Sequence, residues 1–249
     1  MRKWILTLVA LSIFSQVWSQ EVHECGIINY ERRFSIKKAL TESKDGNENP
    51  WMDEIIRMAP KFKIDQFTML WSPGKSRYIF KENTDKSKSR MWGGDVAQHN
   101  EVYKDFSTAK QYSLKEIFEG DYLIEDTIHR FTWKITNEYR EIAGYSCRRA
   151  TCVIQDSLYV IAYYSEDLAS SSGPESFGGL PGMIMGIVMP RMNTTWFATD
   201  VRTECNRSGE IIKPVKGKKI QMDVLNKKLE EEFGRSKKWY QKMIWNLLI

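Results

Sequence analysis

Apolar and polar residues alternate along several short segments of the chain, and a period of two is typical of half-buried β-strands. The first such segment places Ile28, Tyr30, Phe34 and Ile36 on one face. Similar patterns, rich in aromatic and β-branched residues, predict further strands at 62–71, 78–82, 131–136, 147–154, 159–164 and 194–202. Residues 72–75 and 155–157 suit the turns of two hairpins, whereas 102–128 alternates short apolar runs with turns.

One segment departs from this alternation. From Met183 to Val188 there is no polar residue, which predicts a strand buried on both faces in the middle of a sheet. Directly before it, Leu180-Pro181-Gly182 suits a type II turn, because Pro fits the second position and Gly supplies the positive φ of the third.

Two other segments have the spacing of amphipathic helices. Pro50 opens a short early helix that Pro60 ends. The C-terminal helix repeats apolar residues on both sides of Gly234, at Val224, Leu225, Leu229, Phe233, Trp239, Tyr240, Met243, Ile244, Leu247 and Leu248. Many short strands with few helices predict a mainly β fold of the β-rich α+β type, with a strongly curved antiparallel sheet or incomplete barrel. By analogy of fold alone, this is similar to bacterial lipoprotein-carrier proteins.

Residues 1–19 have the composition of a secretory signal peptide. Arg2 and Lys3 precede a short apolar core from Ile5 to Phe14, and small or apolar residues end the segment at Ser19. The core is shorter than the roughly 20 residues that cross a bilayer, and no comparable stretch follows. We therefore expect an exported protein, periplasmic or extracellular, without a transmembrane anchor, in which residues 20–249 form a single β-rich domain that includes the C-terminal helix.

Four cysteines in an exported chain favour disulfide bonds. Cys147 and Cys152 are five residues apart, so in a regular strand they point to opposite faces and cannot bond to each other. We therefore expect each of them to form a long-range bond, with Cys25 or with Cys205.

Charge and motifs argue against several classes of function. The 37 basic and 32 acidic residues leave a net charge of +5 that is mostly scattered, apart from basic clusters at 86–90 and 213–219, so we expect no nucleic-acid partner. Enzyme signatures such as a Gly-x-Ser-x-Gly elbow or a phosphate-binding loop are missing. We expect no cofactor and favour a non-catalytic role. The alternative is a hydrolase or metal-dependent enzyme with a non-standard site that uses His99, His129 or the Gly173-Pro174 loop.

Three landmarks occur in an order found in a known family. The main one runs from Phe177 to Ile187 and reads FGGLPGMIMGI. Upstream of it lie the segment 142–150, which reads IAGYSCRRA, and the strand 159–164 followed by Gly173-Pro174. Together they resemble the GLPGLI family, secreted proteins of Bacteroidetes-type bacteria that have no assigned activity.

The resemblance covers roughly residues 134–188 and has two departures. Met183 and Met185 stand where the family usually has aliphatic residues, and Tyr163-Tyr164-Ser165 replaces a usual Trp-Tyr-Thr tract. The resemblance implies secretion and β architecture, and it implies no substrate.

The glycine-rich motif has a structural and a functional interpretation. It either fixes a turn before a core strand, or its glycines let a ligand or partner backbone approach closely beside the serine-rich loop 170–173. Trp133 and Tyr163 would add contact area to a sugar, peptide or lipid site. The candidate residues for ligand or partner binding are Gly173, Pro174, Phe177, Gly178, Gly179, Leu180, Pro181, Gly182, Met183, Met185, Trp133 and Tyr163.

A tract of four methionines, Met183, Met185, Met189 and Met192, raises the further alternative of copper handling, because thioethers bind Cu(I). Methionine is also a common core residue. The excess of aromatic and aliphatic strand residues over reactive groups favours an exported, non-catalytic binding or accessory protein of the bacterial envelope. Its concave sheet face would hold an apolar ligand, a peptide or a protein partner.

Overall fold

The computed structural model describes residues 22–44, 50–81, 97–118, 120–234 and 237–249. The predicted signal peptide, residues 1–19, lies outside these ranges and stays a prediction.

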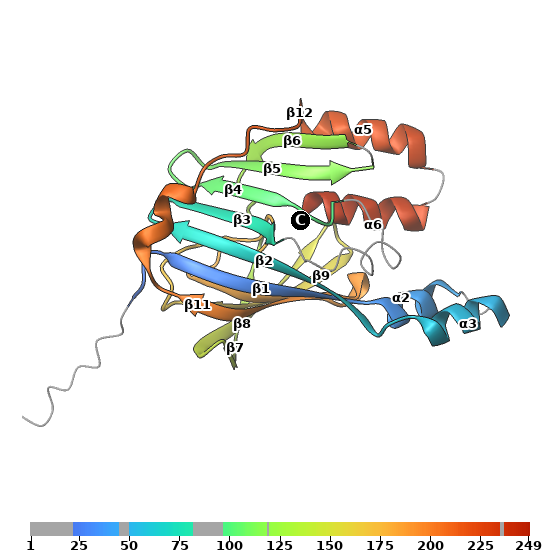
Figure 1. Ribbon diagram of the computed structural model, residues 1–249, viewed down its shortest axis with the longest axis horizontal. Coiled ribbons are helices and arrows are strands. Elements are labelled where there is room, and N and C mark those ends of the chain that lie inside the picture. The colour runs from blue at the N-terminus through green and yellow to red at the C-terminus, as the bar shows by residue number, and fades with distance from the viewer. Residues whose placement is uncertain (1–21, 45–49, 82–96, 119, 235–236) are drawn as a thin grey trace, which may run out of the picture.

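One strongly curved sheet of twelve strands dominates the structure (Figure 1). Its order is β12-β6-β5-β4-β3-β2-β1-β11-β10-β9-β8-β7, and every neighbouring pair is antiparallel except β12 with β6. β12 and β7 end this order without pairing to each other, so the described strands form an open sheet, as predicted. In chain order the strands are β1 (Gly26–Ser35), β2 (Phe62–Ser72), β3 (Lys75–Lys81), β4 (Glu101–Asp105), β5 (Lys110–Ile117), β6 (Gly120–Thr127), β7 (Lys134–Ile142), β8 (Tyr145–Ile154), β9 (Leu158–Ser165), β10 (Met183–Met189), β11 (Thr194–Arg202) and β12 (Lys218–Ile220).

In the described part of the chain, four α-helices and two short 3-10 helices accompany the sheet. α2 (Ile36–Ser43) and α3 (Pro50–Met58) extend beyond β1 and β2, whereas α5 (Met222–Phe233) lies beside β6 and α6 (Lys237–Leu248) lies alongside α5 (Figure 1). The 3-10 helices are η1 (Pro190–Met192) and η2 (Cys205–Glu210). Leu225, Leu229 and Ile244 of α5 and α6 pack with Ile117 and Ile124 of the sheet. None of the described helices is long and apolar enough to cross a membrane.

The apolar run before Pro190 forms β10, which lies between β11 and β9. Its side chains are buried from Met183 through Ile187 and again at Met189. Burial on successive positions means that both faces of the strand are covered, as the pattern predicts.

Two predicted boundaries differ from the structure. β7 begins at Lys134, because Phe131 and Trp133 leave the predicted 131–136 strand and pack against Phe177. Ile36, predicted to continue the first strand, is instead the buried first residue of α2.

The C-terminal region also differs from the prediction of one helix. α5 ends at Phe233 and α6 begins at Lys237, so Gly234, a poor helix former, directly follows the first helix. The three-residue strand β12 was not predicted, because it is too short to show alternation.

Gly182 does not adopt the positive φ of the predicted type II turn. Within the motif the positive φ belongs to Gly179, with φ 84°. Gly182 is required for another reason, because a Cβ there would lie 2.1 Å from the main-chain oxygen of Ser165. The motif thus needs glycine for close approach of two backbones.

The predicted disulfide pairing is wrong, because it joined Cys147 and Cys152 to Cys25 or Cys205. Cys25 and Cys205 form the bond, with Cα atoms 5.3 Å apart, and join the start of β1 to η2. Cys147 and Cys152 are free thiols within the main core, where burial raises their pKa to about 12. They behave as small apolar residues of β8.

Candidate functional site

The inward faces of β4 and β5 carry polar side chains. Val102 of β4 belongs to the main core, and Lys104, two residues on, shares its face. Gln111 of β5 lies opposite Lys104, and Lys115 follows on the same face. All three polar side chains are buried, whereas Tyr103 packs in a separate cluster on the outer face. The interior of the curved sheet is therefore polar along these two strands.

Lys104 binds the loop that precedes β10, residues 170–182, which we call the glycine-rich loop. Its Nζ donates hydrogen bonds to the main-chain oxygens of Gly173 (3.2 Å) and Phe177 (2.5 Å). The hydroxyl groups of Ser76 on β3 and Ser172 in the loop form a further hydrogen bond of 2.8 Å. Because burial penalises the charged ammonium, the pKa of Lys104 is lowered to about 7. The serine-rich loop 170–173 is thus held in place by buried polar contacts.

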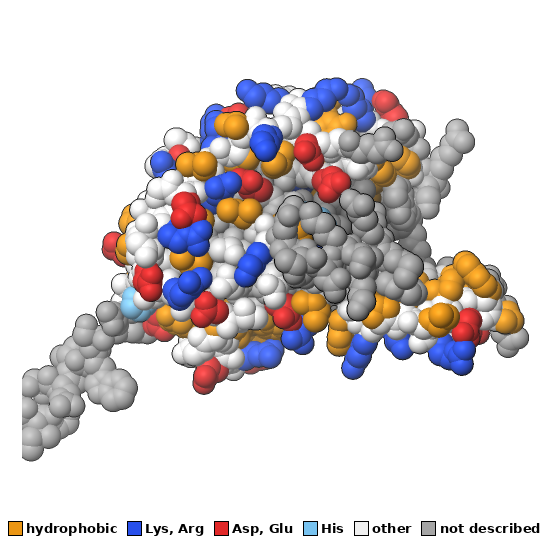
Figure 2. All heavy atoms as spheres, in the orientation of Figure 1, with side chains coloured by type: hydrophobic (Ala, Val, Ile, Leu, Met, Phe, Trp, Pro, Cys, Tyr) orange, Lys and Arg blue, Asp and Glu red, His pale blue; other side chains and the backbone are white. Residues whose placement is uncertain are grey.

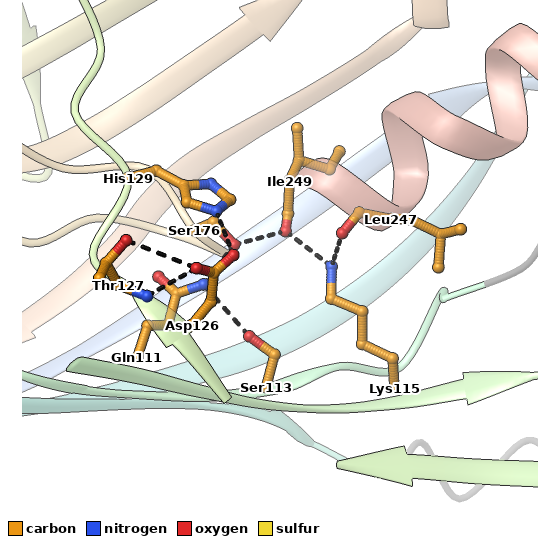
Figure 3. A network of polar contacts seen from close by, with 9 residues as sticks. All are labelled: Gln111, Ser113, Lys115, Asp126, Thr127, His129, Ser176, Leu247 and Ile249. Atoms are coloured by element: carbon orange, nitrogen blue, oxygen red, sulfur yellow. Dashed lines mark hydrogen bonds and ion pairs between the residues drawn. The ribbon is translucent and has the colours of Figure 1, made fainter. Parts of the chain in front are cut away.

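Lys115 makes an equivalent attachment to the residues that end α6 (Figure 3). Its Nζ donates to the main-chain oxygens of Leu247 (2.7 Å) and Ile249 (3.0 Å), and burial lowers its pKa to about 8. Ser176 of the loop donates to the same Ile249 oxygen and accepts a hydrogen bond from Gln111. The loop, β5 and α6 therefore meet in one network.

Glu175 places a carboxyl group in the same interior. It adopts a left-handed φ of 54°, a region that most side chains avoid, and its Oε2 accepts a hydrogen bond from Asn100. Burial raises its pKa, against the opposite effect of Lys115, Arg32 and Lys104. Arg32 itself pairs with buried Asp65 at 2.6 Å. These charged groups are enclosed by protein, and each forms hydrogen bonds with main-chain oxygens or side chains of the fold.

A groove of about 750 Å³, which we call the apolar groove, lies beside this network. Four segments distant in sequence form it: the β4–β5 turn, the end of β6 with the connection after it, the end of β8 and the end of α6. Its lining residues are Ala109, Thr127, Ile128, His129, Arg130, Phe131, Thr132, Val153, Ile154 and Leu248. Val153 is 58% exposed, so an apolar side chain lies open to an incoming ligand.

Aromatic contacts join the apolar groove to the glycine-rich loop. The rings of Phe131 and Phe177 lie 5.3 Å apart, and Phe131 also contacts Trp133 at 5.8 Å. The indole Nε1 of Trp133 donates to the main-chain oxygen of Gly178 at 2.9 Å. The rigid loop therefore supports one wall of the groove.

The structure brings only some of the predicted binding residues together. Trp133 meets Phe177 and Gly178 beside the apolar groove. Tyr163 lies elsewhere, against Phe197. Gly179 and Pro181 are exposed, and the buried members of the predicted set are Gly173, Pro174, Phe177, Gly178, Leu180, Gly182, Met183 and Met185.

The structure shows where the methionines of the copper-handling alternative and the histidines of the enzyme alternative lie. Met183, Met185, Met189 and Met192 are all buried in the main core, which supports a packing role. His99 precedes β4 and His129 follows β6.

Strand register separates these two histidines. Glu101 of β4 pairs with Leu114 of β5, and Leu114 in turn pairs with Leu123 of β6. Thr127 of β6 lies at the other end of these three strands. The histidines therefore lie beyond opposite ends of β4 to β6, and His129 pairs with Asp126 at 3.2 Å (Figure 3). Among the residues described, no three His, Cys, Asp or Glu side chains form a group able to hold a metal ion.

The sequence analysis missed the groove residues Val153, Ile154 and Leu248 and the interior residues Lys104, Lys115 and Glu175. Alternation within 110–117 is visible, but it does not show which face points inward. A polar inner face is recognisable only once the loop and α6 that cover it are placed.

Comparisons with known proteins agree with the fold and name no activity. Residues 152–186 match a family model described as "Protein of unknown function (Porph_ging)", and a comparison with curated proteins finds no match. Two structures of PNGF-II are similar. The one in space group C2 has a TM-score of 0.51 and 14% identity, and covers 89% of this chain and 33% of that one.

The other, in space group P21, has a TM-score of 0.51 and 13% identity and covers 82% of this chain and 32% of that one. The chain thus spans about a third of the length of PNGF-II. At these identities the likeness is one of fold.

Proposed function

We propose that the protein is an exported, non-catalytic binding protein of the bacterial envelope that holds an apolar segment of a protein or peptide partner in the apolar groove. The observation that carries the proposal is the open groove of about 750 Å³ beside the motif that gives the chain its family resemblance. Its size lies within the range of about 300–1,000 Å³ typical of ligand sites.

The chemistry of the groove suits an apolar occupant. Phe131, Val153, Ile154 and Leu248 offer apolar surface, and burying such surface is favourable by about 25 cal/mol per Å². Since Trp133 and the loop brace one wall, the site is formed before binding and little ordering free energy is required.

The non-catalytic part of the proposal is supported by the state of the reactive groups. Lys104, Lys115 and Glu175 have shifted pKa values, a feature of many active sites. Here each is buried and engaged with main-chain oxygens or side chains of the fold. Burial in the interior of the fold explains these pKa shifts.

Export is part of the same proposal. It is supported by the signal-like composition of residues 1–19 and by the Cys25–Cys205 bond, since disulfides persist mainly in oxidising compartments. The GLPGLI resemblance of residues 134–188 supports an envelope location and belongs to the proposal for that reason.

Replacing Val153 with Asp tests the groove directly. The fluorescent apolar probe 1-N-phenylnaphthylamine should bind the wild type and bind V153D about tenfold more weakly or worse, because a charge would have to be desolvated in the site. Titration of probe fluorescence measures this.

A matched control is Val224→Asp, which makes the same change at an exposed valine of α5 that lines no part of the apolar groove. V224D should bind the probe like the wild type. Equal affinities for V153D and V224D, with both variants folded by circular dichroism, would rule out the groove as the binding site.

A further inference from the structure

A second groove of about 770 Å³ lies where the segment 213–221 crosses β5 and β6. We call it the basic groove. Its lining residues are Lys110, Tyr112, Leu123, Glu125, Asp126, Thr127, Lys213, Pro214, Val215, Lys219, Ile220 and Gln221. In Figure 2, blue Lys and Arg side chains gather along the upper edge of the molecule, where β12 and α5 lie in Figure 1.

The acidic side chains of the basic groove form ion pairs, whereas Lys213 and Lys219 form none among the described residues. Its acidic groups already have partners, since Glu125 pairs with Lys110 at 2.5 Å and Asp126 contacts His129. Lys213 lies over the ring of Tyr112, 4.1 Å from its centre. Within the described part of the chain, no ion pair involves the lysines of the crossing segment, Lys213, Lys216, Lys218 and Lys219. Lys213 also acts on Glu125 through its charge, but the three lysines Lys110, Lys213 and Lys219 against the two acidic groups leave the basic groove with an excess of positive charge for a partner.

The basic groove and the apolar groove meet at the end of β6. Thr127 lines both, the adjacent residues Ala109 and Lys110 line one groove each, and so do Asp126 and Ile128 on either side of Thr127. The Asp126–His129 contact lies at this junction, beside Gln111 on the neighbouring strand (Figure 3).

The edge of the sheet favours a polypeptide as the occupant. β12 is the last strand in the sheet order, so its outer edge pairs with no other described strand. Such an edge can form main-chain hydrogen bonds with an extended peptide. Val215, 80% exposed, adds an apolar contact beside the lysines.

We propose that the two grooves form one binding cleft for an extended segment of a partner protein, with its apolar part in the apolar groove and an acidic part against the lysines of the basic groove. Binding of the apolar part of the segment rests on the proposed function. Binding of its acidic part by the lysines is the new element.

The test uses two labelled peptides, an apolar sequence alone and the same sequence followed by a run of Glu and Asp. Fluorescence anisotropy should show that the acidic extension tightens binding roughly tenfold at low salt and that added salt removes the gain. K213E/K219E should lose this gain while keeping its affinity for the apolar peptide. The matched control K227E/K228E, on exposed lysines of α5, should keep the gain.

The outcomes separate the two proposals. Equal affinity of both peptides, with the apolar peptide still sensitive to V153D, would overturn the acidic part and leave the proposed function standing. Failure of both peptides to bind would overturn both. Binding of phosphatidylglycerol vesicles through Lys213 and Lys219, without a gain from the acidic extension, would also overturn the inference, because the charge would then serve a lipid surface.

Discussion

At the scale of single residues, the buried Lys104 links the stability of the fold to pH. Its pKa is lowered to about 7 in the folded state and is near 10.5 when the chain unfolds. Between these values the unfolded chain binds a proton that the folded chain does not, so stability rises with pH. Lys115, with a pKa of about 8, contributes in the same direction from a higher pH.

We predict that the free energy of unfolding rises between pH 7 and 8 and that Lys104 contributes up to about 1 kcal/mol of this rise. K104M removes the titrating group and should flatten this rise. Urea unfolding at several pH values measures the slope. K75M, at an exposed lysine of the adjacent strand β3, should keep the wild-type slope, and an unchanged slope in K104M would contradict the assignment.

Gly182 shows how a single residue fixes the entry to β10. Because a Cβ would lie 2.1 Å from the Ser165 main-chain oxygen, Gly182→Ala must displace one of two backbones. We expect a loss of stability of about 1–3 kcal/mol, measured as a lower urea midpoint.

The control for this prediction is Gly209→Ala, since a Cβ at Gly209 would meet nothing within 4 Å. This variant should stay within about 0.5 kcal/mol of the wild type. If the two alanine variants were equally stable, the close approach would not be what requires glycine in the motif.

At the scale of elements, the sequence predicts those strands whose surroundings match a simple pattern. β10 was recognisable because it is apolar at successive positions, and the β2–β3 hairpin because Pro73 and Gly74 mark its turn. α2 was missed because Ile36 extends the alternation of β1 by one step. β4 and β5 gave short apolar runs that did not show their polar inner face.

The candidate site was less predictable than the strands. The motif and Trp133 were both singled out from the sequence, and Phe177 and Gly178 of the motif do contact Trp133. The groove itself joins residues near 109, 130, 153 and 248, and their proximity follows only from strand order. The disulfide pairing could not be predicted from sequence spacing either, because Cys25 and Cys205 are 180 residues apart.

At the scale of the whole molecule, the polar interior and the surface cleft form one arrangement. Lys104 holds the glycine-rich loop, whose Phe177 packs against Phe131 of the apolar groove, and Lys115 holds the end of α6, whose Leu248 lines that groove. A cleft built on segments fixed in this way is preorganised, so binding should leave the backbone nearly unchanged.

The most direct test of the account is hydrogen–deuterium exchange with and without the peptide that joins an apolar to an acidic sequence. The account predicts slower exchange confined to residues 109–112, 123–132, 152–154 and 213–221, which border the cleft. Protection centred instead on Tyr163 and Phe197, or no protection at saturating peptide, would contradict it.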